Sequence, residues 1–167
     1  GLGDVYKRQG LNTVYTSNRS SPVQVGSGTT WSQINTRNGV VLAIKTDGTL
    51  WTWGYNAAGR LGLNDTVYRS SPTQVGVATN WNLIATSVSY AACVIATKTD
   101  GTLWTWGSNI TGNLGQNDRV YRSSPTQIGS LTNWNNIDIA HRAAIASRTD
   151  GRLFAWGRNN NEELGVN

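Results

Sequence analysis

Hydrophobic and polar positions alternate in short runs along this chain, and the runs come in pairs. The clearest pair is Cys93–Thr97 and Leu103–Trp106, with Asp100-Gly101 between them. Short runs rich in β-branched and aromatic residues are typical of strands. Asp-Gly between two such runs favours a two-residue type I′ turn, in which both central residues adopt positive φ. The pattern predicts an antiparallel hairpin whose second strand carries two tryptophans.

The same hairpin occurs again before and after this one. The turn aspartates Asp47, Asp100 and Asp150 are separated by 53 and then 50 residues (100 − 47, 150 − 100). A period near fifty with about four short strands per unit is typical of β-propellers and related arrays. In the middle unit the expected strands are Trp81–Ala85, Cys93–Lys98, Leu103–Trp106 and Ser124–Gly129. Proline near the start of the fourth predicts an edge strand, and no segment has the periodicity of a helix.

The repeats divide the chain into a short leader and several units. Residues 1–9 match nothing later in the sequence and form a non-repeat segment, in which we interpret Asp4–Gln9 as foreign to the fold, a scar of cloning or sequence assembly. The divisions that we predict for the rest are the end of a preceding blade at 10–30, repeat 1 at 31–80, repeat 2 at 81–133 and a truncated repeat 3 at 134–167.

Tryptophan packing can be predicted from the strand period. Side chains alternate between faces, so Trp104 and Trp106 share one face while Leu103 and Thr105 share the other. A buried tryptophan removes about 150–250 Å² from water, which a lone sheet cannot supply. We therefore expect neighbouring sheets on both faces, and we favour a core role for the tryptophans over a role as stacking platforms for sugars or bases.

The repeated residues resemble a known family. The unit reads A-x-K-T-D-G-x-L-W-x-W-G, then N-x-x-G-x-L-G, then R-S-S-P-x-Q-x-G, and it covers residues 10–167. This unit is similar to the repeat of the regulator of chromosome condensation. The resemblance implies an all-β fold made of four-stranded antiparallel blades of a β-propeller, usually seven to a ring. About three blades fit this length, so we expect a partial chain, or a ring completed by other copies.

The resemblance has one clear departure. Family repeats usually carry His-Thr or His-Ser seven residues before the turn aspartate, where this chain has Val40-Val41, Cys93-Val94 and Ala143-Ala144. His141 lies outside that position. The amino-acid sequence of the repeats looks closer to bacterial, viral and environmental members of the family than to the eukaryotic exchange factor.

Composition narrows the function only slightly. The formal charge is +5, and the 14 Lys and Arg residues are scattered, which favours a solvated surface over a nucleic-acid site. The single cysteine, Cys93, sits in an apolar run, which favours a small buried hydrophobe over a reactive thiol. The sequence shows no apolar stretch long enough for a membrane span. Methionine is absent, which favours a processed chain or a piece of a longer protein.

The sequence offers little for catalysis, and we expect no enzyme, cofactor or metal site. His141 has no triad motif around it, and the turn aspartates are explained by their turns. Asn64-Asp65 and Asn117-Asp118 lack the ligand density of a calcium loop. We interpret Glu162-Glu163 as exposed charge.

One pattern suggests a binding surface. An arginine precedes Ser-Ser-Pro in each unit, and neighbouring blades would present these arginines on one rim. The candidate partner-binding residues are Arg19, Arg69, Arg122, Tyr68 and Tyr121. The alternative is a solvated loop residue duplicated with the repeat, which is the interpretation that we favour.

The sequence thus predicts a non-catalytic scaffold with a protein partner. The open alternatives are part of a guanine-nucleotide exchange factor for a small GTPase, as the resemblance implies, and an adhesin of a viral or secreted fibre. Uncovered blade faces also predict self-association.

Overall fold

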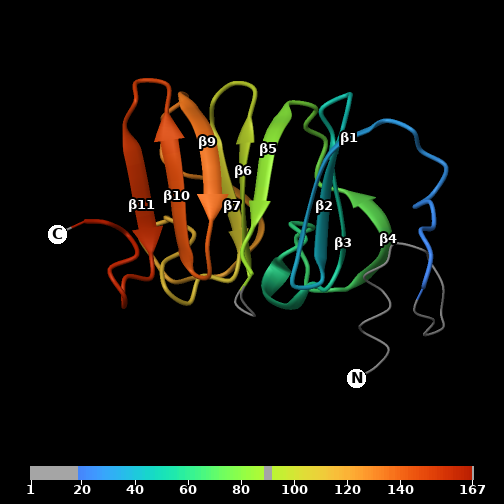
Figure 1. Ribbon diagram of the computed structural model, residues 1–167, viewed down its shortest axis with the longest axis horizontal. Coiled ribbons are helices and arrows are strands. Elements are labelled where there is room, and N and C mark those ends of the chain that lie inside the picture. The colour runs from blue at the N-terminus through green and yellow to red at the C-terminus, as the bar shows by residue number, and fades with distance from the viewer. Residues whose placement is uncertain (1–18, 89–91, 167) are drawn as a thin grey trace.

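The computed structural model describes residues 19–88 and 92–166. It contains three antiparallel sheets that stand side by side along the longest axis of the molecule (Figure 1). The strands of the first sheet are β1 (Trp31–Arg37), β2 (Val40–Lys45), β3 (Leu50–Gly54) and β4 (Arg69–Gln74). Those of the second are β5 (Trp81–Thr86), β6 (Cys93–Lys98), β7 (Leu103–Gly107) and β8 (Arg122–Gln127). The third contains β9 (Trp134–Ile139), β10 (Ala143–Arg148) and β11 (Leu153–Gly157).

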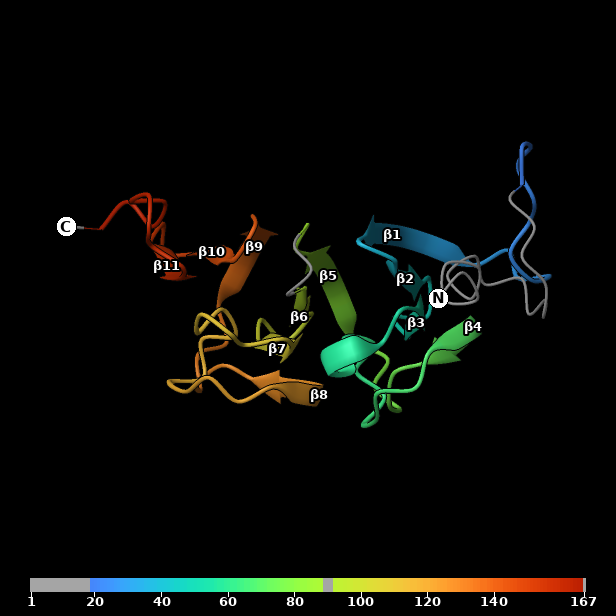
Figure 2. The same cartoon turned by 90° about the horizontal axis from the view of Figure 1, so that it is seen from below.

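Each sheet is a meander in which neighbours in sequence are neighbours in space. The first two sheets have the orders β1-β2-β3-β4 and β5-β6-β7-β8, and the third has β9-β10-β11. Figure 2 shows β1 and β5 on one side of the row, with β4 and β8 on the opposite side. This is the blade architecture that the sequence predicts. We refer to the sheets as blades 1, 2 and 3.

Strand boundaries differ slightly from the expected ones. The fourth strand of blade 2 begins at Arg122 rather than Ser124, so Pro125 lies inside it. The strand tolerates proline because β8 pairs with β7 alone and the other side of its backbone needs no ladder donor. Among the described residues, helical structure is limited to a 3-10 turn, η2, at Ala57–Gly59.

The hairpin turn is not of type I′. Gly101 has a φ of 76°, but Asp100 is absent from the residues with positive φ. Lys98 N donates to Thr102 O, and Gly101 N donates to Lys98 O, which makes a three-residue loop closed by a glycine bulge. The Asp100 carboxylate accepts bonds from both Thr102 N (3.0 Å) and Thr102 Oγ1 (2.6 Å). These bonds stabilise an ordinary aspartate conformation, so positive φ is needed at the glycine only.

Two apolar cores lie between the three blades. The core between blades 1 and 2 is built from Leu42, Leu50 and Val75 on one side and from Trp81, Ile84 and Trp106 on the other. The core between blades 2 and 3 joins Ile95, Leu103 and Leu114 to Trp134, Ile139 and Ala144. Both faces of blade 2 are therefore covered, as the alternation of its side chains predicts.

Candidate partner-binding rim

The two ends of the blades differ in character. The Asp-Gly hairpin turns lie at one end, and the long loops after β3 and β7 lie at the other (Figure 1). These loops span residues 55–68 and 108–121, and they lead into β4 and β8. We call the end formed by these loops and by the first residue of β4 and of β8 the loop rim.

A buried asparagine holds each loop in shape. Asn56 and Asn109 are fully buried. Asn56 Nδ2 donates to the carbonyl oxygens of Asp65 (3.1 Å) and Val67 (3.0 Å), and its Oδ1 accepts from Leu61 N (2.8 Å). Asn109 makes the same bonds in blade 2. A buried amide with its hydrogen bonds satisfied fixes the loop backbone, so side chains on the rim project from a rigid base.

The rim arginines form ion pairs inside their own loops. Arg69 Nη2 lies 2.5 Å from Asp65 Oδ2, and Arg122 Nη2 lies 2.5 Å from Asp118 Oδ2. Each guanidinium also donates to a loop carbonyl, Val67 O at 2.8 Å and Val120 O at 3.0 Å. Both arginine side chains remain 25% exposed, so part of each guanidinium faces solvent.

The ion pairs lower the pKa of the two aspartates. Partial burial acts to raise the pKa of Asp65, but hydrogen bonds from Val67 N and the Arg69 guanidinium outweigh it, and the pKa falls below its ordinary value. For Asp118 the hydrogen bond from Val120 N is the largest cause of the lowered pKa, followed by the bond from Arg122. Both carboxylates are therefore ionised at neutral pH, and each balances the charge of the arginine that it pairs with, while Arg119 adds an exposed positive charge to the blade 2 loop.

The two rim tyrosines have different surroundings. Tyr68 lies against Tyr55, with ring centroids 4.8 Å apart, and is half-buried. In blade 2 the residue at the position of Tyr55 is Ser108, and Tyr121 is 48% exposed. Arg19 is exposed and precedes the first blade, outside the described strands. The structure thus brings Arg69 and Tyr68 together on one loop and Arg122 and Tyr121 together on the next, and it leaves Arg19 apart.

The hairpin end carries a feature that sequence reasoning missed. Lys98 Nζ lies 4.0 Å from the Trp104 ring centroid and 4.9 Å from that of Trp81. Lys45 is placed in the same way over Trp51 and Trp31. The recurrence of a basic residue two positions before each turn aspartate, at 45, 98 and 148, was the available signal. Cation–π contact accounts for it, since the ring faces attract the ammonium groups.

Most tryptophans serve the core, as expected. Trp81, Trp106 and Trp134 are at most 8% exposed. Trp106 Nε1 donates to Arg60 O of blade 1 at 2.9 Å, and Trp156 Nε1 donates to Asn113 O of blade 2 at 3.1 Å. These bonds tie each blade to a rim loop of the blade before it.

Cys93 and His141 differ in exposure. Cys93 is buried, and burial raises the pKa of its thiol to about 11, as fits a small core residue. His141 is exposed in the turn between β9 and β10. Within residues 19–88 and 92–166, no group of three or more His, Cys, Asp or Glu side chains is placed to hold a metal ion. The same ranges include no helix that could cross a membrane.

Sequence comparison identifies the class of protein that these blades define. The family model for the regulator of chromosome condensation (RCC1) repeat matches residues 47–94 and 100–143, which is more than half of the chain. The chain therefore belongs to the RCC1 repeat family.

Individual relatives share parts of the chain. It is 35% identical over 83 residues to the zebrafish protein RCC2 homolog, covering 47% of this chain and 16% of that protein. It is 32% identical over 111 residues to the Arabidopsis ultraviolet-B receptor UVR8, covering 65% of this chain and 24% of that protein. A human probable E3 ubiquitin-protein ligase, HERC3, is 29% identical over 99 residues, or 59% of this chain and 9% of the ligase. The chain thus spans less than a quarter of each relative.

Solved structures share the fold. Human WBSCR16 superposes with a TM-score of 0.72 at 23% identity, covering 92% of this chain and 40% of that protein. Yeast Prp20p, described together with its binding to Gsp1p and histones, superposes with a TM-score of 0.69 at 17% identity, covering 81% of this chain and 35% of that protein. The sequence relatives named here are vertebrate and plant proteins, so the expected closeness to bacterial and viral members has no support from them.

Proposed function

We propose that this chain is part of a β-propeller that binds other proteins through its loop rim and carries out no chemistry of its own. The observation that carries the proposal is the blade 2 loop, in which Val120 is 60% exposed and Tyr121 48% exposed above a fully buried Asn109. Tyrosine and arginine are enriched at protein interfaces, and rigid presentation lowers the entropy lost on binding. Arg122 adds a partly exposed guanidinium beside them.

The loop rims of blades 1 and 2 differ in some of the residues that a partner could contact. Both loops keep the asparagine and the Asp–Arg pair, yet Tyr55 and Thr66 of blade 1 correspond to Ser108 and Arg119 of blade 2. The shared residues build the loop; of the variable residues, Thr66 and Arg119 are exposed, whereas Tyr55 is half-buried and Ser108 is buried. This division is what a scaffold with a specific protein partner requires. An enzyme would need reactive groups that converge, and the rim acids are engaged by arginine.

The experiment compares capture of partners by three forms of the chain from an extract treated with nuclease. We expect the wild type and a control, Leu153→Asp, to retain the same protein, because Leu153 lies away from the rim. We expect a Tyr121→Ala/Arg122→Gln double variant to lose it. Retention by the rim variant would overturn the proposal, as would capture that depends on nucleic acid.

A second candidate is a part of an exchange factor. It is favoured by the fold shared with Prp20p, whose structure is reported with its binding to Gsp1p. The discriminating measurement is release of a fluorescent guanine nucleotide from a small GTPase of that type. We expect no acceleration from this chain, and an acceleration that the rim variant abolishes would favour the exchange factor instead. A fibre adhesin would also use the rim, with a cell-surface protein as its target.

A further inference from the structure

A groove lies between blades 1 and 2, on the side of the molecule where Figure 2 shows β4 and β8. Its volume is about 360 Å³. Blade 1 and the segment after it contribute residues 62–64 and 74–78, and blade 2 contributes Trp81, Lys98, Trp104, Ser124 and Pro125. Two of the lining residues, Val75 and Trp81, belong to the core between these blades. The groove is therefore bounded by two blades that already pack against each other.

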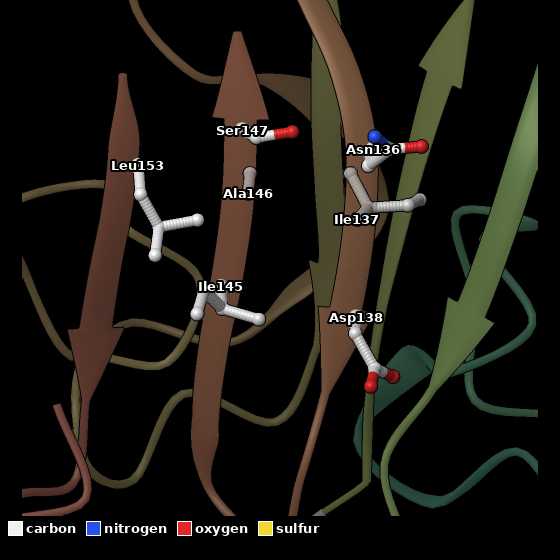
Figure 3. A pocket seen from close by; sticks show the side chains of 7 residues that line it. All are labelled: Asn136, Ile137, Asp138, Ile145, Ala146, Ser147 and Leu153. Carbon is white, nitrogen blue, oxygen red and sulfur yellow. The ribbon is translucent and has the colours of Figure 1, made fainter. Parts of the chain in front are cut away.

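The hollow on the face of blade 3 is of another kind. It lies beside Ile145 and Leu153 of β10 and β11 (Figure 3), and it measures about 130 Å³. The residues at the same positions in blade 2, Ile95 and Leu103, are covered by blade 3. That hollow is therefore one side of a contact between blades, whereas the groove stays open after blades 1 and 2 have come together.

The walls of the groove are mostly apolar. Its apolar lining includes Leu63, Val77 and Pro125. Trp104 is half-buried, and its Nε1 donates to Thr102 Oγ1 at 2.8 Å. The Trp104 ring also meets Trp81 edge to face, with ring centroids 6.1 Å apart. These contacts fix the ring, so the groove presents a rigid aromatic surface to a ligand.

The groove carries a single kind of charge. Among the described residues that line it, Lys98 alone is charged. Its Nζ lies over the rings of Trp104 and Trp81, and it forms no ion pair with a described residue. Asp100 interacts with the Lys98 charge at longer range, but its carboxylate is bonded to Thr102. A cation–π contact holds an ammonium group in place and leaves its N–H groups able to donate, so the groove attracts an anion.

The corresponding cation of blade 3 already has partners. Arg148 Nη2 lies 2.8 Å from Asp150 Oδ2, and Arg148 Nε donates to Asn133 Oδ1 at 2.8 Å. In blade 2 the equivalent aspartate and asparagine bond to each other instead, with Asn80 Nδ2 donating to Asp100 Oδ2 at 3.2 Å. The lysine of blade 2 therefore keeps its donors for a ligand, which the arginine of blade 3 does not.

We propose that this groove binds an extended segment of another protein in which an acidic residue adjoins a large apolar one. The carboxylate pairs with Lys98 Nζ, and the apolar side chain lies against Trp104 and Pro125. Charge complementarity selects the acid, and burial of apolar surface against a rigid ring supplies most of the affinity. A segment fits better than a free acid, because the lining extends from Leu63 in the loop rim to Lys98 at the hairpin end.

The groove is a second binding surface of the scaffold and goes beyond the function proposed for the rim. It adjoins the loop rim at Leu63, but Lys98 and Trp104 lie on β6 and β7. The two surfaces can therefore fail separately. The Tyr121→Ala/Arg122→Gln variant should keep the ligand of the groove, and Lys98→Gln should keep the partner on the rim.

The test is fluorescence anisotropy with an array of labelled peptides and the whole chain at tens of micromolar. Each peptide has Glu before Leu, Phe, Trp or Pro in a Gly-Ser background, and its counterpart has Gln in place of Glu. We expect Glu peptides to bind and the Gln counterparts to bind about fivefold more weakly, as fits the loss of a charge-assisted contact. Binding by none of the Glu peptides, or equal binding of the Gln counterparts, would overturn the proposal.

Variants of the chain locate the site. Lys98→Gln should weaken the bound peptide by about fivefold, whereas Lys45→Gln, which removes the equivalent ammonium group of blade 1, should have no effect. Val77 is 93% exposed, so changes there leave the fold intact. Val77→Glu should weaken binding and Val77→Lys should tighten it. Equal losses in the two lysine variants, or the same response to both charges at position 77, would show that the peptide binds elsewhere.

Benzoate distinguishes a free acid from a segment of a protein. It carries a carboxylate and a ring but no backbone, so we expect it to displace the peptide only at a concentration more than about tenfold above that of an unlabelled peptide. Displacement at equal concentrations would mean that the groove recognises an acid alone, and would overturn the assignment of a protein segment.

Discussion

Leu103 in blade 2 and Leu153 in blade 3 occupy the same place in the repeat, yet Leu103 is fully buried and Leu153 is 65% exposed. The strand sequences around them, Leu-Trp-Thr-Trp-Gly and Leu-Phe-Ala-Trp-Gly, share Leu, Trp and Gly, and the two hairpins have the same register. The difference comes from blade 3, which covers the face of blade 2. The comparison teaches that each face of a blade contributes one side of an interface with a neighbouring blade. The burial of its apolar residues therefore depends on the neighbour as well as on the blade itself.

The largest loss of stability should come from shortening Leu103, with Leu153 as the matched comparison. Leu103→Ala removes a buried side chain between blades 2 and 3, and we expect it to lower the free energy of unfolding by about 2–5 kcal/mol. Leu153→Ala should change it by less than about 0.5 kcal/mol, because the side chain is largely in solvent. Urea unfolding at concentrations where the chain is monomeric measures both. Equal losses would contradict the assignment of a covered and an uncovered face.

Adding a methyl group to Gly62 or to Gly165 compares a loop glycine that a neighbouring blade covers with one that has nothing against it. Gly165→Ala carries only the cost of a left-handed alanine, about 1–2 kcal/mol. Gly62→Ala adds a contact at 2.9 Å with Trp106 Nε1, which disturbs the bond from that atom to Arg60 O. We expect Gly62→Ala to cost about 1–3 kcal/mol more than Gly165→Ala. Thermal unfolding of the two variants, measured side by side, checks the difference, and a larger loss for Gly165→Ala would contradict it.

Acid should weaken the hairpin turns of blades 1 and 2. Bonds from the hydroxyl and then the amide of Thr102 hold the pKa of Asp100 below its ordinary value, and Thr49 does the same for Asp47. A carboxyl whose pKa is lower in the folded state stabilises the fold above its unfolded pKa of about 3.9. This stability is lost as the pH falls through the folded pKa.

We therefore expect the free energy of unfolding to fall as the pH drops below about 5, and to fall less in a Thr102→Ala variant. Urea titrations across that range are the measurement. The matched control is Arg152→Ala, since blade 3 has Arg152 where blade 2 has Thr102. An unchanged acid dependence in Thr102→Ala would rule out the threonine as the cause.

The smallest effect should come from the rim. The Arg122–Asp118 pair is partly exposed, with side-chain exposures of 25% and 35%. Arg122→Gln should cost no more than about 1 kcal/mol in unfolding free energy, since exposed ion pairs contribute little. Added salt should shrink the difference further. A loss comparable to that of Leu103→Ala would mean that the rim, rather than the blade face, holds this part of the fold together.

Much of the fold could be predicted because the same pattern of strands and turns occurs in three units of the sequence. The strand period of the Leu103–Trp106 run and the Asp-Gly turns were sufficient for the hairpin, and Pro125 was sufficient for the edge strand. The turn type was predicted wrongly, because Asp100 bonds to Thr102 and stays out of the left-handed region. That bond depends on a side chain two residues away, which the Asp-Gly signal alone does not include.

The rim was less predictable. Arg69 and Arg122 were recognisable as a recurring pair, but their bonds to Asp65 and Asp118 depend on how the loop folds back over its buried asparagine. The contrast between stacked Tyr68 and exposed Tyr121 arises from Ser108 in place of Tyr55, a difference between repeats rather than a repeated residue. The difference between the two rims that we propose a partner recognises therefore comes from a position where the repeats disagree.

The sequence by itself determined the secondary structure and the repeat, because strand period, turn residues and proline act over a few neighbours in the chain. The tertiary structure decided which faces are covered. The residues at positions 50, 103 and 153 are all leucine, and no local property separates the buried two from the exposed one. Burial depends on whether another sheet lies about 10 Å away, and only the arrangement of the blades in space determines whether one does.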